Sequence, residues 1–221
     1  MTTRTAARTL RVMPDTRRAV AHLKRADPTL AAVIARVGAC RFEARAEGTH
    51  FEAVARAIVY QQLSGKAAGT IHTRFHALYG GRAPEPAELL ATADEPLRAA
   101  GLSRQKVGYL RDLAARVAAG DVPLDRVEAL GDDDVIAALT RVKGVGRWTA
   151  QMFLMFRLGR PDVLPDLDLG VQNAIRLAYG LRAAPKPADV LRVGACWAPH
   201  RTVASWYLWR YLDNGGGQLG D

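Results

Sequence analysis

The sequence predicts an all-α protein, and two observations support this prediction. Apolar residues recur at helical spacing between capping residues and glycine or proline, whereas strand-like alternation of useful length is missing from the 221 residues. Hydrophobic residues make up 49% of the chain, which is ample for a packed core. The length fits one compact unit or two small lobes.

The first clear helix begins at Thr49. Thr49 and Glu52 form a capping-box pattern, and apolar residues follow at helical intervals. Ser64 then caps a second helix, which a pair of glycines ends. A short corner at 62–64 joins the two helices.

Shorter helices follow this pair. We expect one over 88–91 and a longer one that begins at Ser103 and ends before Gly120. The three aspartates at 132–134 supply caps and a favourable helix-dipole charge to the next helix.

The last third of the chain alternates helices with turns. Residues 147–158 are apolar on nearly every face, which predicts a buried helix. A turn at Pro165 and Asp166 precedes a helix over 169–179, and a final helix covers roughly 201–212.

The formal net charge of +9 indicates a polyanionic partner. Arginine dominates the excess, and its planar fork matches phosphate geometry, although a skewed genome composition would produce the same bias. Lysine occurs only at Lys24, Lys66, Lys106, Lys143 and Lys186.

Cys40 and Cys196 are far apart and have no companion at metal-ligand spacing, which excludes a site built from several thiolates. No apolar run reaches the roughly 18 residues of a membrane span, and we expect a cytoplasmic protein that associates with the nucleoid on DNA. The basic segment 2–12 is similar to an organellar transit peptide, but a flexible basic terminus is the favoured interpretation.

Two glycines flank Val145 between two helices that are very close in sequence. Gly144 and Gly146 would let backbone N–H groups approach a phosphate, while Lys143 and Arg147 add positive charge. Such a contact positions DNA without reading its sequence. Many helix corners use glycine for a tight turn alone, so this pattern by itself leaves both interpretations open.

The longer pattern Leu139–Ala150, followed by Val163–Val171, is more specific. It resembles the helix-hairpin-helix, Gly/Pro-rich loop and aspartate signature of the base-excision DNA glycosylase superfamily, and within it the 3-methyladenine DNA glycosylase II (AlkA-like) branch. Further matches are 56–64, Gly101 to Ser103 with Lys106 and Tyr109, and 197–201 leading to Trp209. The resemblance spans roughly residues 50–212, and this looks like a form with a shortened N-terminal region.

The resemblance implies two helical lobes with a cleft between them. We expect a central lobe over 52–160 that contains the hairpin, and a discontinuous lobe over 15–51 plus 161–214. Residues 1–14 are expected to be a flexible basic terminus and 215–221 a disordered tail.

The family's catalytic aspartate maps onto Asp168, the second acid of the loop. Asp166, the first acid of the loop, is not expected to be catalytic. From its position alone Asp168 is an N-cap for the helix at Leu169, and the two roles are compatible. A fixed carboxylate stabilises the positive charge that develops on deoxyribose or orients the attacking water. Alkylated bases often carry charge and leave readily, so one carboxylate suffices.

The resemblance places the lysine nucleophile of strand-cleaving relatives at Trp148. Tryptophan forms no Schiff base, so we predict base removal without lyase activity. The alternatives are a non-catalytic helix-hairpin-helix DNA-binding protein, a bifunctional glycosylase/AP lyase, or an unrelated all-α repressor.

A base must leave the duplex before this chemistry, and related enzymes fill the gap with an apolar side chain. Leu63 is the candidate wedge, with a core leucine as the alternative. Lys66 holds a phosphate or is a solvated charge. The other predicted DNA contacts are Gln62, Ser64, Gly65 and Lys66 near the wedge, and Lys143, Gly144, Val145, Gly146, Arg147 and Thr149 at the hairpin.

A cationic base is attracted to aromatic faces. Trp148 is the favoured stacking surface, and Met152 stands where related pockets often have a tyrosine. Trp206 and Trp209 are further candidates, although most aromatics at helical spacing belong to a core.

We expect a monomer that binds double-stranded DNA containing damaged bases and needs no cofactor, catalytic metal or membrane. By resemblance, a monovalent cation is the one candidate ion, on the carbonyl groups of Thr140, Val142 and Val145.

Overall fold

The computed structural model describes residues 16–45 and 47–216. Within these ranges it contains twelve α-helices, two short 3-10 helices and no β-strand, so the all-α prediction is confirmed. The predictions for residues 1–14 and 217–221 lie outside the described residues. Gly215 and Gly216, which we placed in the disordered tail, donate backbone hydrogen bonds to Leu212 and Tyr211.

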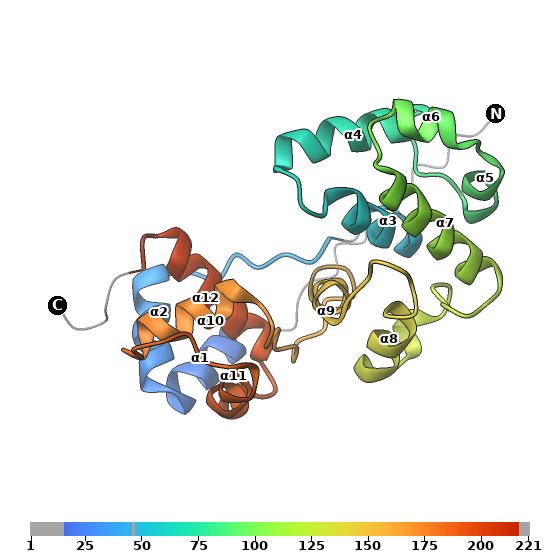
Figure 1. Ribbon diagram of the computed structural model, residues 1–221. Coiled ribbons are helices and arrows are strands. Elements are labelled where there is room, and N and C mark those ends of the chain that lie inside the picture. Colours follow the sequence, from blue (N-terminus) through green and yellow to red (C-terminus); the bar gives the residue numbers. More distant parts are fainter. Residues whose placement is uncertain (1–15, 46, 217–221) are drawn as a thin grey trace, which may run out of the picture. The chain divides into compact units, whose positions relative to one another are not determined.

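The chain divides into two compact units (Figure 1). The first, called here the discontinuous unit, comprises Met1–Ala46 and Leu154–Asp221, and the second, called the contiguous unit, comprises Glu47–Phe153. The divisions predicted from the sequence lie at 51/52 and 160/161, a few residues further along the chain in both cases. Helix α9 crosses the division at 153/154.

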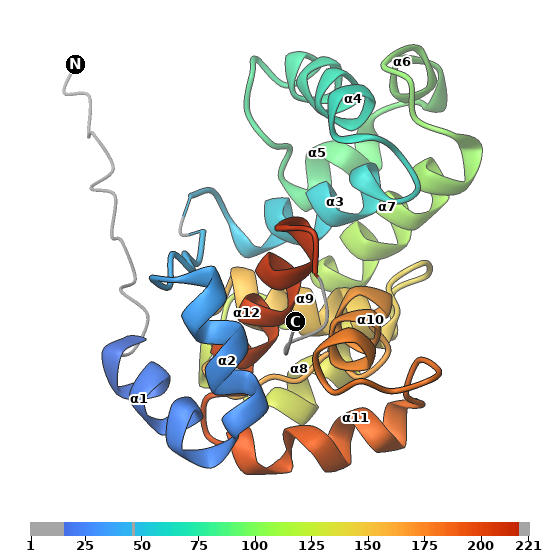
Figure 2. The ribbon, with the colours of Figure 1, turned by 90° about the vertical axis from the view of Figure 1, so that its left-hand side faces the viewer.

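In the discontinuous unit, α12 packs against α1, α2 and α10, and Figure 2 shows these helices from their own side. The largest buried side chains of the discontinuous unit come from segments far apart in the sequence and include Leu23, Trp197 and Tyr211. The elements are α1 (Thr16–Ala26), α2 (Pro28–Val37), α10 (Leu169–Ala178), α11 (Pro187–Val193), η2 (Gly194–Trp197) and α12 (Arg201–Asp213).

A buried carboxylate connects three of these elements. Asp27 Oδ1 caps α2 by accepting the Leu30 N–H at 3.0 Å, while Oδ2 accepts hydrogen bonds from the Tyr179 hydroxyl and, at 2.8 Å, from Trp197 Nε1. Burial and the neighbouring carboxylate raise the pKa of Tyr179, so the phenol stays protonated and donates. The C-terminal end of α10 is thereby fixed to α2 and η2.

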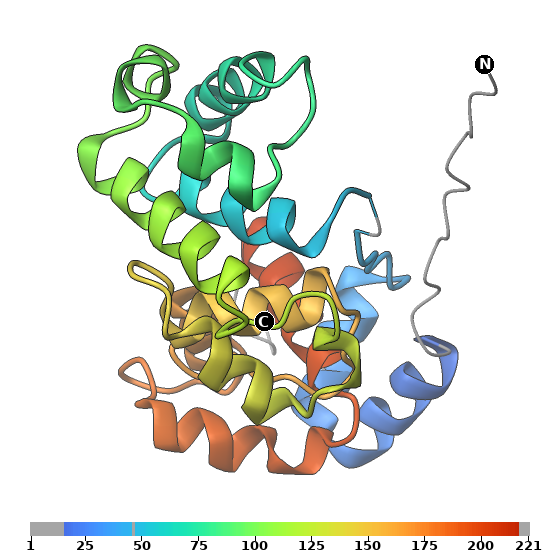
Figure 3. The ribbon, with the colours of Figure 1, turned by 90° about the vertical axis from the view of Figure 1, so that its right-hand side faces the viewer.

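In the contiguous unit, α7 packs against α3, α5 and α6, as Figure 3 shows. The core contains Ile58, Phe75, Leu89, Leu110 and Leu113, all almost fully buried. The elements are α3 (His50–Tyr60), α4 (Gly65–Ala77), α5 (Pro86–Ala91), α6 (Asp94–Ala99), α7 (Arg104–Ala118), η1 (Val127–Ala129), α8 (Asp132–Leu139) and the part of α9 (Arg147–Phe156) that precedes Leu154.

The predicted N-caps are confirmed at four helices. The side chains of Thr49, Ser64, Ser103 and Asp168 each accept a backbone N–H from the first turn of the helix that follows. These caps are local features, and their hydrogen bonds join residues three positions apart.

Other details of the predicted helices were wrong or missing. The N-cap of α8 is Gly131, so the aspartates at 132–134 contribute first-turn charge but not the cap. The helix expected to be buried throughout, α9, exposes Arg147 and Trp148 in its first turn and is buried mainly beyond it. Helices α1, α2, α6 and α11 were not predicted as individual elements.

No helix in ranges 16–45 and 47–216 has both the length and the apolar character that crossing a membrane requires.

Candidate nucleic-acid interface and active site

The predicted hairpin is a tight turn between α8 and α9. Gly144 has a φ of 79°, in the left-handed region that favours glycine. A Cβ at Gly144 would also overlap the ring of Tyr109, whereas a Cβ at Gly146 would meet nothing within 4 Å. The fold therefore requires glycine at 144 but not at 146.

Two of the hairpin N–H groups donate within the protein. The Lys143 N–H donates to Asp112 Oδ2 at 2.8 Å, and the Val145 N–H donates to the Val142 carbonyl at 3.0 Å. Val145 itself is buried, which anchors the turn, while Gly144, Gly146 and Arg147 are exposed. Thr149 lies half-buried in the first turn of α9.

The corner between α3 and α4 contains a strained residue followed by an exposed leucine. Gln62 has a φ of 55°, and it is the one residue other than glycine with a positive φ in the described part of the chain. Leu63 is 40% exposed, so the interpretation of Leu63 as a core leucine is wrong. Gly65 and Lys66 follow as the exposed first residues of α4, after the cap Ser64.

This corner is bonded to the hairpin. Gln61 Nε2 donates to the Gly144 carbonyl at 2.8 Å, across 83 residues of sequence. The two segments predicted to contact DNA therefore lie next to each other in the contiguous unit.

Helix α7 supports both segments with side chains that are three residues apart along the helix. Lys106 Nζ donates to the carbonyls of Val59 at 2.7 Å and Gln61 at 2.8 Å, where α3 ends. Tyr109 packs under Gly144, and its hydroxyl accepts a hydrogen bond from Gln105 Nε2 at 2.6 Å. Asp112 then bonds the hairpin at Lys143.

The charge of Asp112 makes the stability of the fold around the hairpin depend on pH in the acidic range. Burial alone would raise the pKa of this carboxyl group, but hydrogen bonds from the Lys143 N–H and from Arg116 hold the pKa below its ordinary value of 3.8. Because the folded-state pKa is depressed, the stabilisation is present above pH 3.8 and is lost as pH falls through the folded-state pKa.

Asp112→Asn is therefore expected to lower the free energy of unfolding at pH 7 by roughly 1–2 kcal/mol. The difference between wild type and variant should shrink as pH falls below 3.8, because the unfolded chain takes up a proton before the folded Asp112 carboxylate does. Urea unfolding of both proteins at pH 7 and pH 3 measures this. An equal difference at the two pH values would contradict the assigned role of the Asp112 charge.

Asp168 stands at the N-terminus of α10 and is fixed by two donors. Its Oδ1 accepts the Val171 N–H at 2.8 Å and the Trp209 indole N–H at 2.9 Å. The first bond is the helix cap, and the positive end of the helix dipole favours an anion at this position. Leu167 and Leu169 on either side of Asp168 are exposed, whereas Asp166 is 6% exposed and buried.

Trp209 is itself supported by an aromatic stack. Its ring lies 5.9 Å from that of Phe156, which in turn stacks on Phe42 at 5.2 Å. Gly170 leaves the room for the pair of Asp168 and Trp209, since a Cβ there would come 2.9 Å from Asp168 Oδ1 and 3.0 Å from Trp209 Cδ1.

The other predicted pocket residues are distributed over both units. Trp148 is 45% exposed on α9, and Met152 lies one turn further on, half-buried. Trp206 is half-buried on α12 and packs edge-on against Tyr207 at 5.0 Å, whereas Trp209 contacts Asp168.

Sequence reasoning missed the supporting residues. Asp112 and Gln61 contact the hairpin from distant segments, and no local pattern marks them. Gly170 is different, because its place in the first turn of a helix, two residues after the candidate catalytic acid, was a visible signal.

A family profile matches residues 55–199 and is described as HhH-GPD superfamily base excision DNA repair protein. A curated relative, DNA-3-methyladenine glycosylase 1 of Schizosaccharomyces pombe, is 38% identical over 162 residues, which cover 72% of this chain and 71% of the relative.

Two solved structures have the same fold. One is a Schizosaccharomyces pombe 3-methyladenine DNA glycosylase in complex with abasic DNA, with a TM-score of 0.79 and 35% identity over 89% of this chain and 97% of the other. The second is a DNA-3-methyladenine glycosidase from Bacillus halodurans, with a TM-score of 0.79 and 36% identity over 87% and 88% of the two chains. The chain therefore belongs to the HhH-GPD superfamily of base excision DNA repair proteins.

Proposed function

We propose that this protein is a monofunctional DNA glycosylase that hydrolyses the N-glycosidic bond of alkylated bases in DNA. The similarity to proteins named 3-methyladenine DNA glycosylases supports the substrate class. The observation on which the proposal rests most is the carboxylate of Asp168, which two N–H donors fix at the start of α10.

In this proposal Asp168 acts on the sugar. As the bond to the base lengthens, positive charge develops on the deoxyribose, and a fixed carboxylate stabilises that charge or orients the attacking water. The donors Val171 N–H and Trp209 Nε1–H set the orientation of the carboxylate before the reaction begins, which avoids a reorganisation cost. An alkylated, positively charged base leaves without a second residue to protonate it.

The hairpin would hold the DNA backbone. Since the N–H groups of Lys143 and Val145 donate within the protein, the amides proposed to meet a phosphate are those of Gly144 and Gly146. The fold does not require glycine at 146, so the proposed reason for glycine there is that a phosphate must approach the backbone closely. Lys143, Arg147 and Lys66 add charge, and the proposed partner is double-stranded DNA bound by a monomer.

Leu63 is proposed as the wedge that replaces the flipped base. Leu63→Ala is expected to slow base release from duplex DNA about tenfold, equivalent to about 1.4 kcal/mol, because the gap in the stack is no longer filled. The single-turnover rate of base release measures this effect.

Leu78→Ala is the matched control for Leu63→Ala. Leu78 is 41% exposed at the opposite end of α4, so the same truncation removes a similarly exposed side chain away from the corner. Equal rates for the two variants would rule out the wedge role.

Trp148 is proposed as a stacking surface for a cationic base, together with Met152 one turn further along α9. It also occupies the position of the lysine nucleophile in strand-cleaving relatives, which is why no lyase activity is expected.

The proposed function is tested with oligonucleotides that carry single methylated bases. Base release without strand cleavage is expected, and borohydride treatment should trap no efficient protein–DNA adduct. Absence of release from every methylated substrate would refute the glycosylase assignment, whereas a trapped adduct would refute only its monofunctional character.

A further inference from the structure

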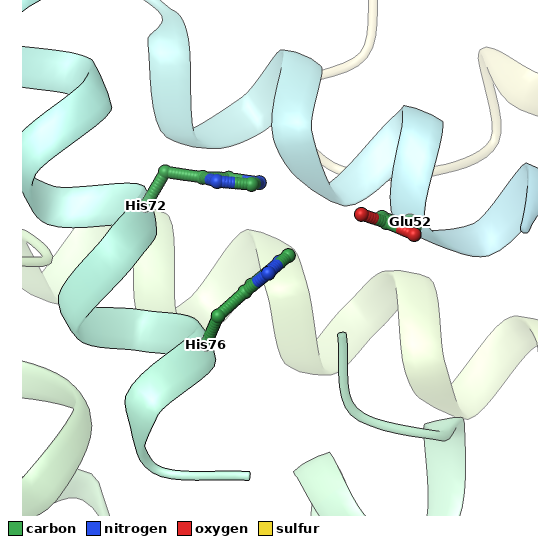
Figure 4. A group of neighbouring side chains, drawn as sticks. All are labelled: Glu52, His72 and His76. Atoms are coloured by element: carbon green, nitrogen blue, oxygen red, sulfur yellow. The ribbon is translucent and has the colours of Figure 1, made fainter. Parts of the chain in front are cut away.

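Three side chains with metal-binding chemistry converge between α3 and α4. The proposed function uses none of them. His72 and His76 are four residues apart on α4, so they lie on one face of the helix, and Glu52 faces them from the first turn of α3 (Figure 4). All three side chains are half-buried, and each offers a ligand atom within 4.8 Å of those of the other two.

The hydrogen bonds of the protein leave part of this cluster unexplained. His72 Nε2 is buried and has no hydrogen-bond partner among the described residues. Its ring lies 4.0 Å from that of His76, tilted by 45°. A buried nitrogen without a partner is costly, and an ion at the site is one of the ordinary explanations for it.

The charge state of the cluster suits a cation. A neutral imidazole offers a lone pair to a metal ion, as binding requires. Arg56 opposes a cation, but its guanidinium lies over the Tyr60 ring at 4.0 Å, and Glu52 supplies a compensating negative charge.

We propose that Glu52, His72 and His76 form a binding site for Zn²⁺ or a similar borderline divalent cation. Two imidazoles and one carboxylate are a common zinc ligand set, whereas Mg²⁺ and Ca²⁺ require mostly oxygen ligands. With metal–ligand bonds of about 2.1 Å, tetrahedral ligand atoms lie roughly 3.4 Å apart, so modest side-chain rotations close the site. Water completes the coordination.

The ion would join α3 to α4. These helices flank the corner at 61–64, where Gln62 is strained and Leu63 is exposed. A bound cation would fix how the two helices cross, and so restrict the corner between them. The inference does not depend on catalysis, because binding is measured without a DNA substrate.

Co²⁺ titration of the untagged, chelator-treated full chain tests the site. The wild type is expected to bind one equivalent with the visible absorption of a tetrahedral Co²⁺ site, and one equivalent of Zn²⁺ should displace it. Zn²⁺ should also raise the melting temperature. Failure of the wild type to bind either ion at micromolar concentration would overturn the proposal.

The double variant His72→Ala/His76→Ala is expected to weaken Co²⁺ binding at least 100-fold. The matched control is His22→Ala/His200→Ala, which removes the histidine pair of the discontinuous unit, whose rings are 5.3 Å apart. This control should bind as the wild type does. Loss of binding in the control but not in the α4 variant would overturn the proposal.

Glu52→Gln provides a second variant should the double substitution unfold the protein. It keeps the shape of the side chain but removes the charge, and it is expected to weaken Co²⁺ binding at least tenfold with no loss of helical circular dichroism. Unchanged affinity in this folded variant would exclude Glu52 as a ligand.

Discussion

Asp168→Asn is expected to lower the single-turnover rate of base release by roughly 10² to 10⁴-fold while leaving DNA affinity within about twofold. Asparagine is close to aspartate in shape and also caps helices, so α10 and its bond to Val171 should persist. What is lost is the negative charge that the proposed mechanism places beside the developing cation. A release assay and a binding titration on the same methylated duplex measure the two quantities.

Asp166→Asn is the control for the loss of charge in the same loop. Asp166 is two residues away but buried, and its backbone carbonyl accepts a hydrogen bond from Gln172 Nε2 at 2.9 Å. Base release should stay within a few-fold of wild type if the variant is folded. A non-catalytic DNA-binding protein, the alternative class, would give Asp168→Asn and wild type the same behaviour in every assay.

The helix starts that were predicted correctly are determined by residues close to one another in the sequence. The side chains of Ser64, Ser103 and Asp168 each accept the backbone N–H of the residue three positions later. The capping residue and the start of its helix can therefore be recognised in the same short stretch of sequence. Helix α6 lacks these signals. Its N-cap is Ala93, without a side-chain hydrogen bond, and the helix is only six residues long with Pro96 in its first turn.

The contacts that position the site were beyond prediction for a different reason. Gln61 bonds to Gly144 and Trp209 bonds to Asp168, across 83 and 41 residues respectively. Helical periodicity shows which face of a helix is apolar, but it does not show which polar side chains meet after packing. The resemblance to a family predicts Trp209 near the base, and this stays a prediction, but its hydrogen bond to the Asp168 carboxylate was not predicted.

The cluster on α4 shows the same limit. The spacing of His72 and His76 is visible in the sequence, yet two histidines on one helical face are insufficient to indicate a metal site. The third ligand atom, from Glu52, comes near them only because α3 crosses α4. The crossing depends on the packing of both helices and not on the residues around the histidines.

The position of Trp209 leads to the second large prediction. Gly170→Ala adds one carbon that would come 2.9 Å from Asp168 Oδ1, 3.0 Å from Trp209 Cδ1 and 3.2 Å from Trp209 Nε1. These contacts are too close, so the carboxylate and the indole must move apart by a few tenths of an ångström. Displacement of the proposed catalytic carboxylate on this scale is expected to slow base release roughly 10- to 100-fold with DNA affinity unchanged.

Gly108→Ala separates this effect from that of alanine in a helix. Gly108 lies on the exposed face of α7, where a Cβ meets nothing within 4 Å, so alanine there should stabilise the protein by about 0.5–1 kcal/mol and leave base release unchanged. At Gly170 the same substitution adds the close contacts with Asp168 and Trp209, so a slower rate is assigned to their displacement only when the variant keeps its helical circular dichroism and its melting temperature. Wild-type rates in a folded Gly170→Ala variant would contradict the expected displacement of the Asp168 carboxylate.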